Sequence, residues 1–468
     1  MANTGSRTYD VIVVGGGNAG LVAALSARHV VDSVLLLERA PTWRRGGNSR
    51  HTRDIRYAHP AGEPFTTGEA YPVEELLDDL QRVGGGHNQE MANVVVEQSC
   101  GVADFMTAHG VRWQDPLRGT LHLSRTNRFM LGGGKALVNS YYQTAESMGI
   151  HVEYESSVED IVLDGGDRVT GVVVDRGGAR EMVGARAVVV TSGGFEANLE
   201  WLRRYWGDAV DNYVIRGTPY NDGRVLANLL SKGAATAGDP KGFHAVALDA
   251  RSPKFDGGIA TRLDSVPFGI AVNKHGKRFY DEGEDFWPKR YAIWGRLIAE
   301  QPDQLAYSFV DSRTIDCFLT SLYRPYEANS IGEVATMLGL DPSVVTETVR
   351  EFNASIVAGG VFDPGSLDSC RTQGLTPSKS HWAVPIETPP FYGYPLRPGI
   401  TFTYLGLAVD RCCRVQMANG ATVENLFAAG EIMSGNILRS GYLAGFGLTI
   451  GTVFGQIAGT EAGRYVHS

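Results

Sequence analysis

The chain has 468 residues, 43% of them hydrophobic, and a formal net charge of −9. An acidic balance without a stripe of Lys and Arg argues against a nucleic-acid partner. No stretch reaches the ~18 consecutive apolar residues that a membrane-spanning helix needs, so we do not expect an integral membrane protein. The length allows two or three domains, or one large domain with an insertion.

The cysteine pattern and the first residues bear on location. The five cysteines, at positions 100, 317, 370, 412 and 413, form no C-x-x-C pair, and the last two are adjacent. Such a pattern is typical of a reducing compartment. The first ten residues, MANTGSRTYD, contain no apolar segment that resembles a signal peptide. We therefore expect a cytoplasmic protein.

The first forty residues carry the strongest motif. A short apolar strand begins at Asp10 and runs into glycines at positions 15, 17 and 20. In a strand–turn–helix unit the first glycine allows a tight turn, the second lets a pyrophosphate approach the backbone, and the third lets the helix pack closely on the strand. A small-residue helix over 21–27 and a second strand ending at Glu38 follow. An acid at this spacing typically accepts the ribose hydroxyls, so the unit predicts dinucleotide binding rather than a merely structural glycine-rich turn.

The position of the motif favours FAD as the dinucleotide. Flavoproteins usually carry it near the N-terminus, and the chain has no second fingerprint for a nicotinamide dinucleotide. The run 132–135, Gly-Gly-Gly-Lys, suggests a phosphate-binding P-loop, but Ala136 follows where that motif needs a hydroxyl. FAD is therefore the better interpretation.

A polar segment with arginines at positions 44, 45, 50, 53 and 56 follows the second strand. It shows no apolar periodicity, so it is either a solvated basic loop or a loop that lines the flavin. We favour the second, with Asn48 and Ser49 facing the cofactor.

The next part of the chain reads as a mixture of helices and strands. Residues 73–110 and 135–148 have helical spacing, whereas 152–163, 168–175 and 181–190 read as strands. The last of these strands leads into Ser-Gly-Gly at 192–194, a second place where the backbone can approach a cofactor.

The amino-acid composition changes between about residues 240 and 400, where aromatic residues and prolines are more frequent. An amphipathic helix is expected over 341–357, capped by Asp341. A strand then runs into Gly430 and Glu431, and a small-residue helix over 452–465 can point its N-terminus at the flavin.

We therefore predict an α/β protein. A discontinuous FAD-binding domain of the Rossmann-like, glutathione-reductase type would span 1–240 and 400–468, and an α+β cap domain would span 241–399. The residues expected to contact FAD are Gly15, Gly17, Asn18, Ala19, Gly20, Glu38, Arg39, Gly46, Gly47, Asn48, Ser49, Gly133, Gly134, Val158, Ser192, Gly193, Gly194, Asn198, Gly430, Glu431, Gly447, Thr449 and Ile450.

Several segments together make the chain similar to a known family. They are residues 15–20 with Glu38, 47–53, 119–123, 131–135, 191–195, 221–223, 276–282, 401–406 and 430–447. Over nearly its whole length the chain resembles the FAD-binding flavoprotein family of fumarate reductases, succinate dehydrogenase flavoprotein subunits and 3-ketosteroid dehydrogenases, and within it the tricarballylate dehydrogenases. The resemblance implies hydride transfer between flavin N5 and a carbon next to a carboxylate or ketone. It also implies a substrate that lies between the FAD domain and the cap.

The chain departs from the family at three positions. Where succinate and fumarate enzymes place a proton-donating arginine, the resemblance points to a position near Ser265, within residues 262–267. Phe402 and Thr403 stand where a substrate-binding histidine is expected. Succinate and fumarate are therefore unexpected substrates. Asn48 stands where succinate dehydrogenase links its flavin to a histidine, so we expect non-covalent FAD, with His51 as the alternative attachment site.

The resemblance also nominates side chains for the substrate. His244 matches a substrate-contacting histidine, with a buried hinge histidine as the alternative. Tyr442 resembles the tyrosine that polarises a ketone oxygen in ketosteroid dehydrogenases, with packing on the flavin as the alternative. Arg439 has the chemistry of a bidentate carboxylate clamp. The further candidates are Arg125, His122, Arg290 and Tyr291, with Tyr291 and Tyr404 as bases only beside cations.

We expect an FAD-dependent dehydrogenase that oxidises a CH–CH bond next to a carboxylate, converting a tricarballylate-like polycarboxylate to an alkene. The alternatives are a desaturase or ene-reductase of a cyclic ketone and a non-catalytic flavin-binding or electron-relay protein. The sequence has no iron–sulfur or haem-attachment cysteine pattern. The electron acceptor is thus open between a quinone, a partner redox protein and O₂.

Overall fold

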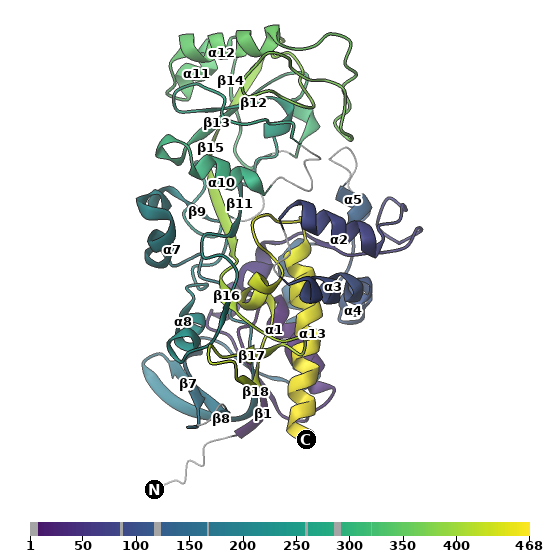
Figure 1. Ribbon diagram of the computed structural model, residues 1–468, viewed down its shortest axis with the longest axis vertical. Helices are drawn as coiled ribbons and strands as arrows, with labels where there is room; N and C mark the ends of the chain where they lie inside the picture. The colour runs from purple at the N-terminus through teal and green to yellow at the C-terminus, as the bar shows by residue number, and fades with distance from the viewer. Residues whose placement is uncertain are drawn as a thin grey trace.

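Apolar runs that are buried on both faces build the larger of the two main sheets. The computed structural model describes residues 8–84, 88–116, 123–165, 168–257, 261–284, 292–319 and 321–468. The larger sheet has eight strands and lies at the end of the molecule where β1 and the C-terminus are drawn, whereas the six-stranded sheet extends toward the opposite end (Figure 1). The α/β fold class expected from the sequence is confirmed.

The order along the larger sheet is β17-β18-β8-β1-β2-β5, and β6 and β7 extend it beside β8. Val13 in β1 pairs in parallel with Leu36 on one side and with Val189 on the other. Such near-continuous apolar strands are typical of parallel sheets that are covered on both faces. The strands are β1 (Thr8–Val14), β2 (Val34–Leu37), β5 (His151–Glu153), β6 (Ser157–Leu163), β7 (Val169–Arg176), β8 (Ala179–Val190), β17 (Arg414–Gln416) and β18 (Thr422–Ala428).

The single strand expected over 152–163 is wrong, because the structure has two strands, β5 and β6, in that segment. Glu155 between them adopts φ 53°, in the left-handed region, and this backbone turn ends the first strand. The helical spacing over 73–110 likewise resolves into three separate helices, α2, α3 and α4. The α-helices described before residue 240 and after residue 400 are α1 (Asn18–Arg28), α2 (Val73–Arg82), α3 (Gln89–Gln98), α4 (Val102–Ala108), α5 (Leu123–Thr126), α6 (Gly133–Ser147), α7 (Leu199–Trp206), α8 (Arg224–Ser231) and α13 (Phe446–His467).

The six-stranded sheet is mostly antiparallel and is organised around β15. Its order is β11-β15-β13-β12, and β14 and β9 also pair with β15. Its strands are β9 (Val214–Ile215), β11 (Phe243–Asp249), β12 (Ile270–Asn273), β13 (Ala306–Asp311), β14 (Tyr326–Ala328) and β15 (Phe391–Thr403). β9 lies inside the segment 1–240 yet pairs with β15. The two-domain division with boundaries at 240 and 400 remains a prediction.

Helices α10 (Ile293–Ala299), α11 (Ile331–Met337) and α12 (Pro342–Ala354) belong to the end of the molecule formed by this second sheet (Figure 1). The expected cap of α12 is present, because the Asp341 carboxylate accepts hydrogen bonds from the N–H groups of Ser343 (2.9 Å) and Val344 (3.3 Å). The remaining short strands are β3 (Asp54–Arg56), β4 (Asn127–Phe129), β10 (Thr236–Ala237) and β16 (Gly406–Leu407).

The longest helix, α13, lies against α1 along a row of glycines at positions 451, 455, 459 and 463. A Cβ atom at Gly455 would lie 2.8 Å from the carbonyl oxygen of Ala19, and one at Gly459 would lie 2.2 Å from that of Ala23. The missing side chains therefore allow the two helix backbones to approach closely. α13 also begins at Phe446, several residues before the helix expected from the sequence.

We predict that Gly459→Val lowers the free energy of unfolding by about 1–3 kcal/mol, since the added atoms meet the α1 backbone in a close-packed interface. The midpoint of thermal unfolding measures the change. Gly101→Ala is the matched control, because nothing lies within 4 Å of a Cβ at Gly101. Equal midpoints for the two variants would show that this helix contact is not tightly packed.

Candidate active site

The turn between β1 and α1 opens onto a cavity. The three motif glycines meet different constraints there. A Cβ at Gly15, whose φ is 102°, would lie 2.8 Å from the carbonyl oxygen of Thr191, and one at Gly20 would lie 1.8 Å from that of Gly15. A Cβ at Gly17 would instead meet nothing closer than Ser49 Oγ at 3.6 Å. Gly15 and Gly20 are thus required by the protein's own packing, whereas Gly17 leaves an open approach from the cavity to the backbone.

Glu38 lies at the end of β2 and lines the same cavity. Its carboxylate accepts hydrogen bonds from the N–H groups of Ala40 (2.8 Å) and Gly46 (3.2 Å) and from the hydroxyl of Tyr142 (3.4 Å). Burial raises the pKa of Glu38, and these donors oppose the shift. The arrangement fixes an acceptor at the place where the motif predicts a ribose-binding acid.

Asn18 connects the N-termini of α1 and α13. Its amide nitrogen Nδ2 donates to the carbonyl of Leu448 (3.1 Å) and to Thr452 Oγ1 (3.1 Å). Within the described residues, its Oδ1 is a buried acceptor without a hydrogen-bond donor. Two helix N-termini, which favour anions, therefore lie at one cavity wall.

The basic segment forms a short helix, η2 (Gly47–His51), against the cavity. Asn48 connects η2 to β15 and to the segment that follows β9: its Nδ2 donates to the carbonyl of Thr401 (2.7 Å), and its Oδ1 accepts from the N–H of Thr218 (2.8 Å). His51 lies on the other side of η2, 2.8 Å from Asp256 Oδ1, and burial lowers its pKa. It lines a second cleft together with Gly133 and Gly134, not the first cavity.

The end of the cavity nearest β15 is formed by Thr401, Phe402 and Tyr442. His244, on β11, is stacked on Tyr442 with ring centroids 3.9 Å apart and an angle of 8° between the rings. The Tyr442 hydroxyl accepts a hydrogen bond from the N–H of Gly447 at 2.8 Å. His244 is thus a buried imidazole directly behind the cavity wall.

Two buried arginines influence this histidine. Arg216 donates to Thr401 Oγ1 (3.1 Å), and Arg262 forms an ion pair with Asp264 (2.6 Å). Burial, followed by the charges of Arg216 and Arg262, holds the pKa of His244 well below its usual value, so the ring is neutral at pH 7. We did not anticipate either arginine from the sequence, because only tertiary structure brings β9, β11 and residue 262 together.

Comparison with known proteins agrees with this geometry. A protein family described as FAD binding domain matches residues 10–448. The chain belongs to this family. It is an FAD-dependent oxidoreductase that acts on CH–CH groups, and FAD is its cofactor.

The family's relatives vary in their named reactions. A probable fumarate reductase of Shewanella frigidimarina is 26% identical over 98% of this chain and 76% of its own length. A 4-oxocyclohexanecarboxylate 2-dehydrogenase of Sinomonas cyclohexanicum is also 26% identical, over 99% of this chain and 96% of its own length. The open conformation of a flavocytochrome c3 fumarate reductase shares the fold, with a TM-score of 0.77 and 22% identity over 100% of this chain and 80% of that one.

The cavity fits FAD on three observations: the open approach at Gly17, the buried acid Glu38, and the unmatched acceptor Asn18 Oδ1 beside two helix N-termini. Most residues nominated from the sequence line it. They are Gly15, Gly17, Asn18, Ala19, Glu38, Arg39, Gly47, Asn48, Ser49, Val158, Ser192, Gly193, Gly430, Glu431 and Gly447.

Other nominated residues lie outside the cavity lining. Gly20 and Gly46 pack against neighbouring backbone and against Val138, and Gly194 gives room to the Glu431 carboxyl. Asn198 caps α7 by accepting from the N–H of Trp201, and Thr449 donates to the carbonyl of Arg56. Ile450 is fully buried in the core. Lining residues that the sequence analysis missed include Ser156, Ser157, Thr218, Tyr220, Asn221, Asp222, Thr401, Phe402, Leu448 and Gly451.

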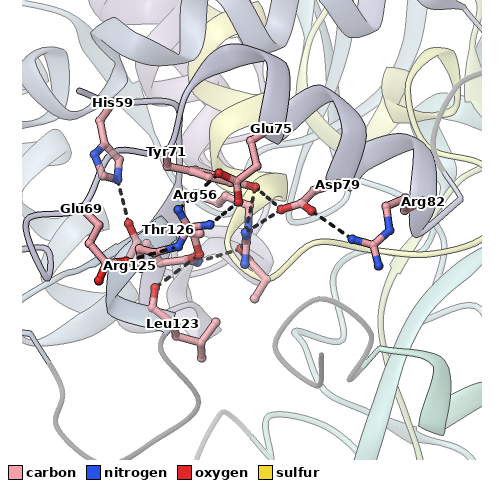
Figure 2. A network of polar contacts seen from close by, with 12 residues as sticks. Arg56, His59, Glu69, Tyr71, Glu75, Asp79, Arg82, Leu123, Arg125 and Thr126 are labelled. Atoms are coloured by element: carbon pink, nitrogen blue, oxygen red, sulfur yellow. Dashed lines mark hydrogen bonds and ion pairs between the residues drawn. The ribbon is translucent and has the colours of Figure 1, made fainter. Parts of the chain in front are cut away.

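The candidate Arg125 lies in a network of polar contacts away from the cavity lining (Figure 2). It donates to the carbonyl of Ala70 (2.8 Å) and binds the carboxylate of Glu75. Figure 2 shows Asp79 between Arg56 and Arg82, with the Tyr71 hydroxyl donating to Asp79 at 2.7 Å. This network supports the cavity indirectly.

Arg56, a fully buried member of that network, donates to the carbonyl of Ala444 at 3.1 Å. The bond secures the turn that carries Tyr442 and Gly447 into the cavity. Arg439 is exposed and lines a separate depression with Asp239. Tyr404 is buried and donates to the carbonyl of Gly441 at 2.7 Å.

Ser265, near which the family's arginine is expected from the sequence, is buried with its Oγ 2.9 Å from Ser308 Oγ. His122, Arg290 and Tyr291 lie outside the described residues. Within the described ranges, no helix is long and apolar enough to cross a membrane.

We predict that Gly17→Val keeps the fold but lowers the affinity for FAD at least about tenfold, because its side chain would occupy the open approach to the backbone. The backbone at Gly17 (φ −76°) suits any residue. The ratio of flavin absorbance to protein absorbance after purification measures the loss, and circular dichroism checks the fold. Wild-type flavin content in this variant would place the pyrophosphate elsewhere.

Proposed function

We propose that the protein oxidises a CH–CH bond next to a carboxylate in a small polycarboxylate of the tricarballylate type, producing an alkene. The observation that carries the proposal is the pair of buried guanidinium groups, Arg216 and Arg262, whose charges help to lower the pKa of His244 behind the cavity wall. Arginine is suited to binding carboxylates because its planar fork can donate two parallel hydrogen bonds. A substrate with several carboxylates matches more than one such group.

In this proposal Arg216 binds a substrate carboxylate and His244 accepts the proton. A carboxylate held by Arg216 gains stabilisation as enolate-like charge develops during removal of the neighbouring proton. The same carboxylate offsets the positive charges that lower the pKa of His244, so substrate binding raises that pKa and makes the imidazole a better proton acceptor. Bound FAD supplies the hydride acceptor. Ser265, hydrogen-bonded to Ser308, offers no cationic proton donor, which supports the direction toward the alkene.

A cyclic ketone is the second candidate substrate. The Tyr442 hydroxyl accepts from the Gly447 N–H, and its own proton can be donated to a carbonyl oxygen at the cavity wall. The relative from Sinomonas cyclohexanicum is named for a substrate that contains both a ketone and a carboxylate. Such a molecule would use Tyr442 and the arginines together.

The proposed location is the cytoplasm. Cys100, Cys317, Cys370, Cys412 and Cys413 are all free thiols, which supports a reducing compartment. The electron acceptor is a quinone, a partner redox protein or O₂.

We expect anaerobic addition of tricarballylate to bleach the visible flavin absorbance rapidly, whereas succinate, citrate and a 3-ketosteroid leave it unchanged. The paired arginines favour several carboxylates, and the site departs from the succinate pattern near Ser265. Citrate also has several carboxylates, but its central carbon carries a hydroxyl and no hydrogen, so it has no CH–CH bond to oxidise. A stopped-flow absorbance trace with each compound, together with 4-oxocyclohexanecarboxylate, measures this. Bleaching by ketones alone would overturn the polycarboxylate proposal and favour the second candidate.

Arg216→Lys should raise the substrate concentration for half-maximal bleaching by about 10–100-fold, because lysine keeps the charge but loses the two-pronged hydrogen bond. Retained flavin absorbance shows that the site remains assembled. Arg439→Met is the matched control, and because Arg439 is exposed in a separate depression we expect less than about a twofold change. A large effect of Arg439→Met and none of Arg216→Lys would move the carboxylate clamp to Arg439.

A further inference from the structure

Two glutamates meet beneath the cofactor cavity. Glu196 follows β8 and is fully buried, and Glu431 begins the short helix η8 (Gly430–Asn436) and lines the cavity. Their carboxyl groups lie within hydrogen-bonding contact of each other. Two carboxylate oxygens can form such a bond only when one of them carries a proton.

The surrounding donors indicate where that proton lies. Glu196 Oε1 accepts from Asn221 Nδ2 at 2.9 Å and also from Asn48 Nδ2. Its Oε2 is buried, and no N–H of the described residues donates to it. A proton on Glu431 gives this oxygen the donor that it needs. Glu196 is then the charged acceptor, and Glu431 is the neutral acid.

Glu431 is held in a matching position. Its Oε1 accepts from the N–H of Thr403 at 2.8 Å and from Thr403 Oγ1 at 3.3 Å. The backbone N–H of Gly194 also faces this carboxyl. The groups that face the pair are thus Asn48 from η2, Asn221 from the turn before α8, Thr403 from β15 and the Gly194 backbone, and each of them is neutral.

Three glycines make room for this network. A Cβ at Gly194 would lie 2.3 Å from Glu431 Oε1, and one at Gly193 would lie 2.6 Å from Asn221 Nδ2. At Gly217 it would lie 2.3 Å from Asn48 Oδ1. Each of these three positions is a glycine, and a larger residue there would collide with a polar group of the network. The local backbone is therefore shaped to accommodate the pair of glutamates.

We propose that Glu196 and Glu431 share one proton and, as a singly charged pair, position Asn48 and Asn221 at the cavity wall, so that FAD binding is linked to that proton. Both residues act on the cofactor site as positioning residues. The second ionisation would place two carboxylates against each other in a dry environment, next to a cavity that takes an anionic dinucleotide.

The direction of the pH dependence follows from the burial of the pair. Burial raises the pKa of Glu196 to about 7, and burial and the neighbouring carboxyl raise the pKa of Glu431 well above its usual value. A group whose pKa is raised by folding stabilises the folded protein at low pH, and this contribution is lost as pH rises through the folded-state pKa. FAD affinity and thermal stability should therefore both fall toward alkaline pH.

The test is the dissociation constant of FAD, measured by equilibrium dialysis of the holoenzyme from about pH 6 to pH 9. We expect the constant of the wild type to rise about tenfold across this range, with a slope of at most one proton. Glu431→Gln should flatten the curve, because the glutamine amide donates to Glu196 permanently, as the protonated acid does. The slope is the readout, since Glu431 lines the cavity and its replacement also shifts the absolute affinity.

Glu196→Gln is the second variant and should also remove the slope, because its amide can donate to an ionised Glu431. Glu181→Gln, an exposed acid on β8, is the matched control and should keep the wild-type slope. Loss of the protonated-carboxyl band from the infrared spectrum of Glu431→Gln would report the shared proton directly. A wild type without a slope, or a Glu431→Gln variant with the wild-type slope, would overturn the proposal.

Discussion

The close approach of α1 and α13 is the constraint on which the rest of the site depends. Glycines at every fourth position of α13 remove the side chains that would separate the two helix backbones. Asn18 then joins the helix N-termini through Leu448 and Thr452. Two segments more than four hundred residues apart thereby form one wall, where partial positive charge from both helices favours an anionic cofactor.

Burial decides the charge state of the polar groups around that wall. It raises the pKa of Glu38 and of the pair formed by Glu196 and Glu431, whereas it lowers the pKa of His244 with the help of two arginines. In a dry environment each of these charges depends on a specific partner. The proposed links between cofactor binding, substrate charge and proton position therefore all depend on the low dielectric of this buried region.

The sequence predicts the site well where a function requires a local backbone shape. The turn at Gly15, the open backbone at Gly17 and the acid at Glu38 lie in one strand–turn–helix–strand unit, so their spacing alone brings them to one cavity. The sequence was less informative about single residues that were proposed as cofactor contacts outside this unit. Thr449 and Asn198 are near lining residues in sequence, but their side chains turn to the Arg56 carbonyl and to a helix cap.

The sequence by itself determined the α/β class, the family and the cofactor, because these depend on periodicity and on short motifs. Only the tertiary structure decided which charged groups lie near the proposed substrate end. Arg216 and His244 come from segments that are joined by the pairing of β9 and β11 with β15, and Arg262 forms a backbone bridge with Leu248 of β11, whereas Arg439 lines another depression. Long-range strand pairing and burial set these positions, and neither is encoded in the local spacing of residues.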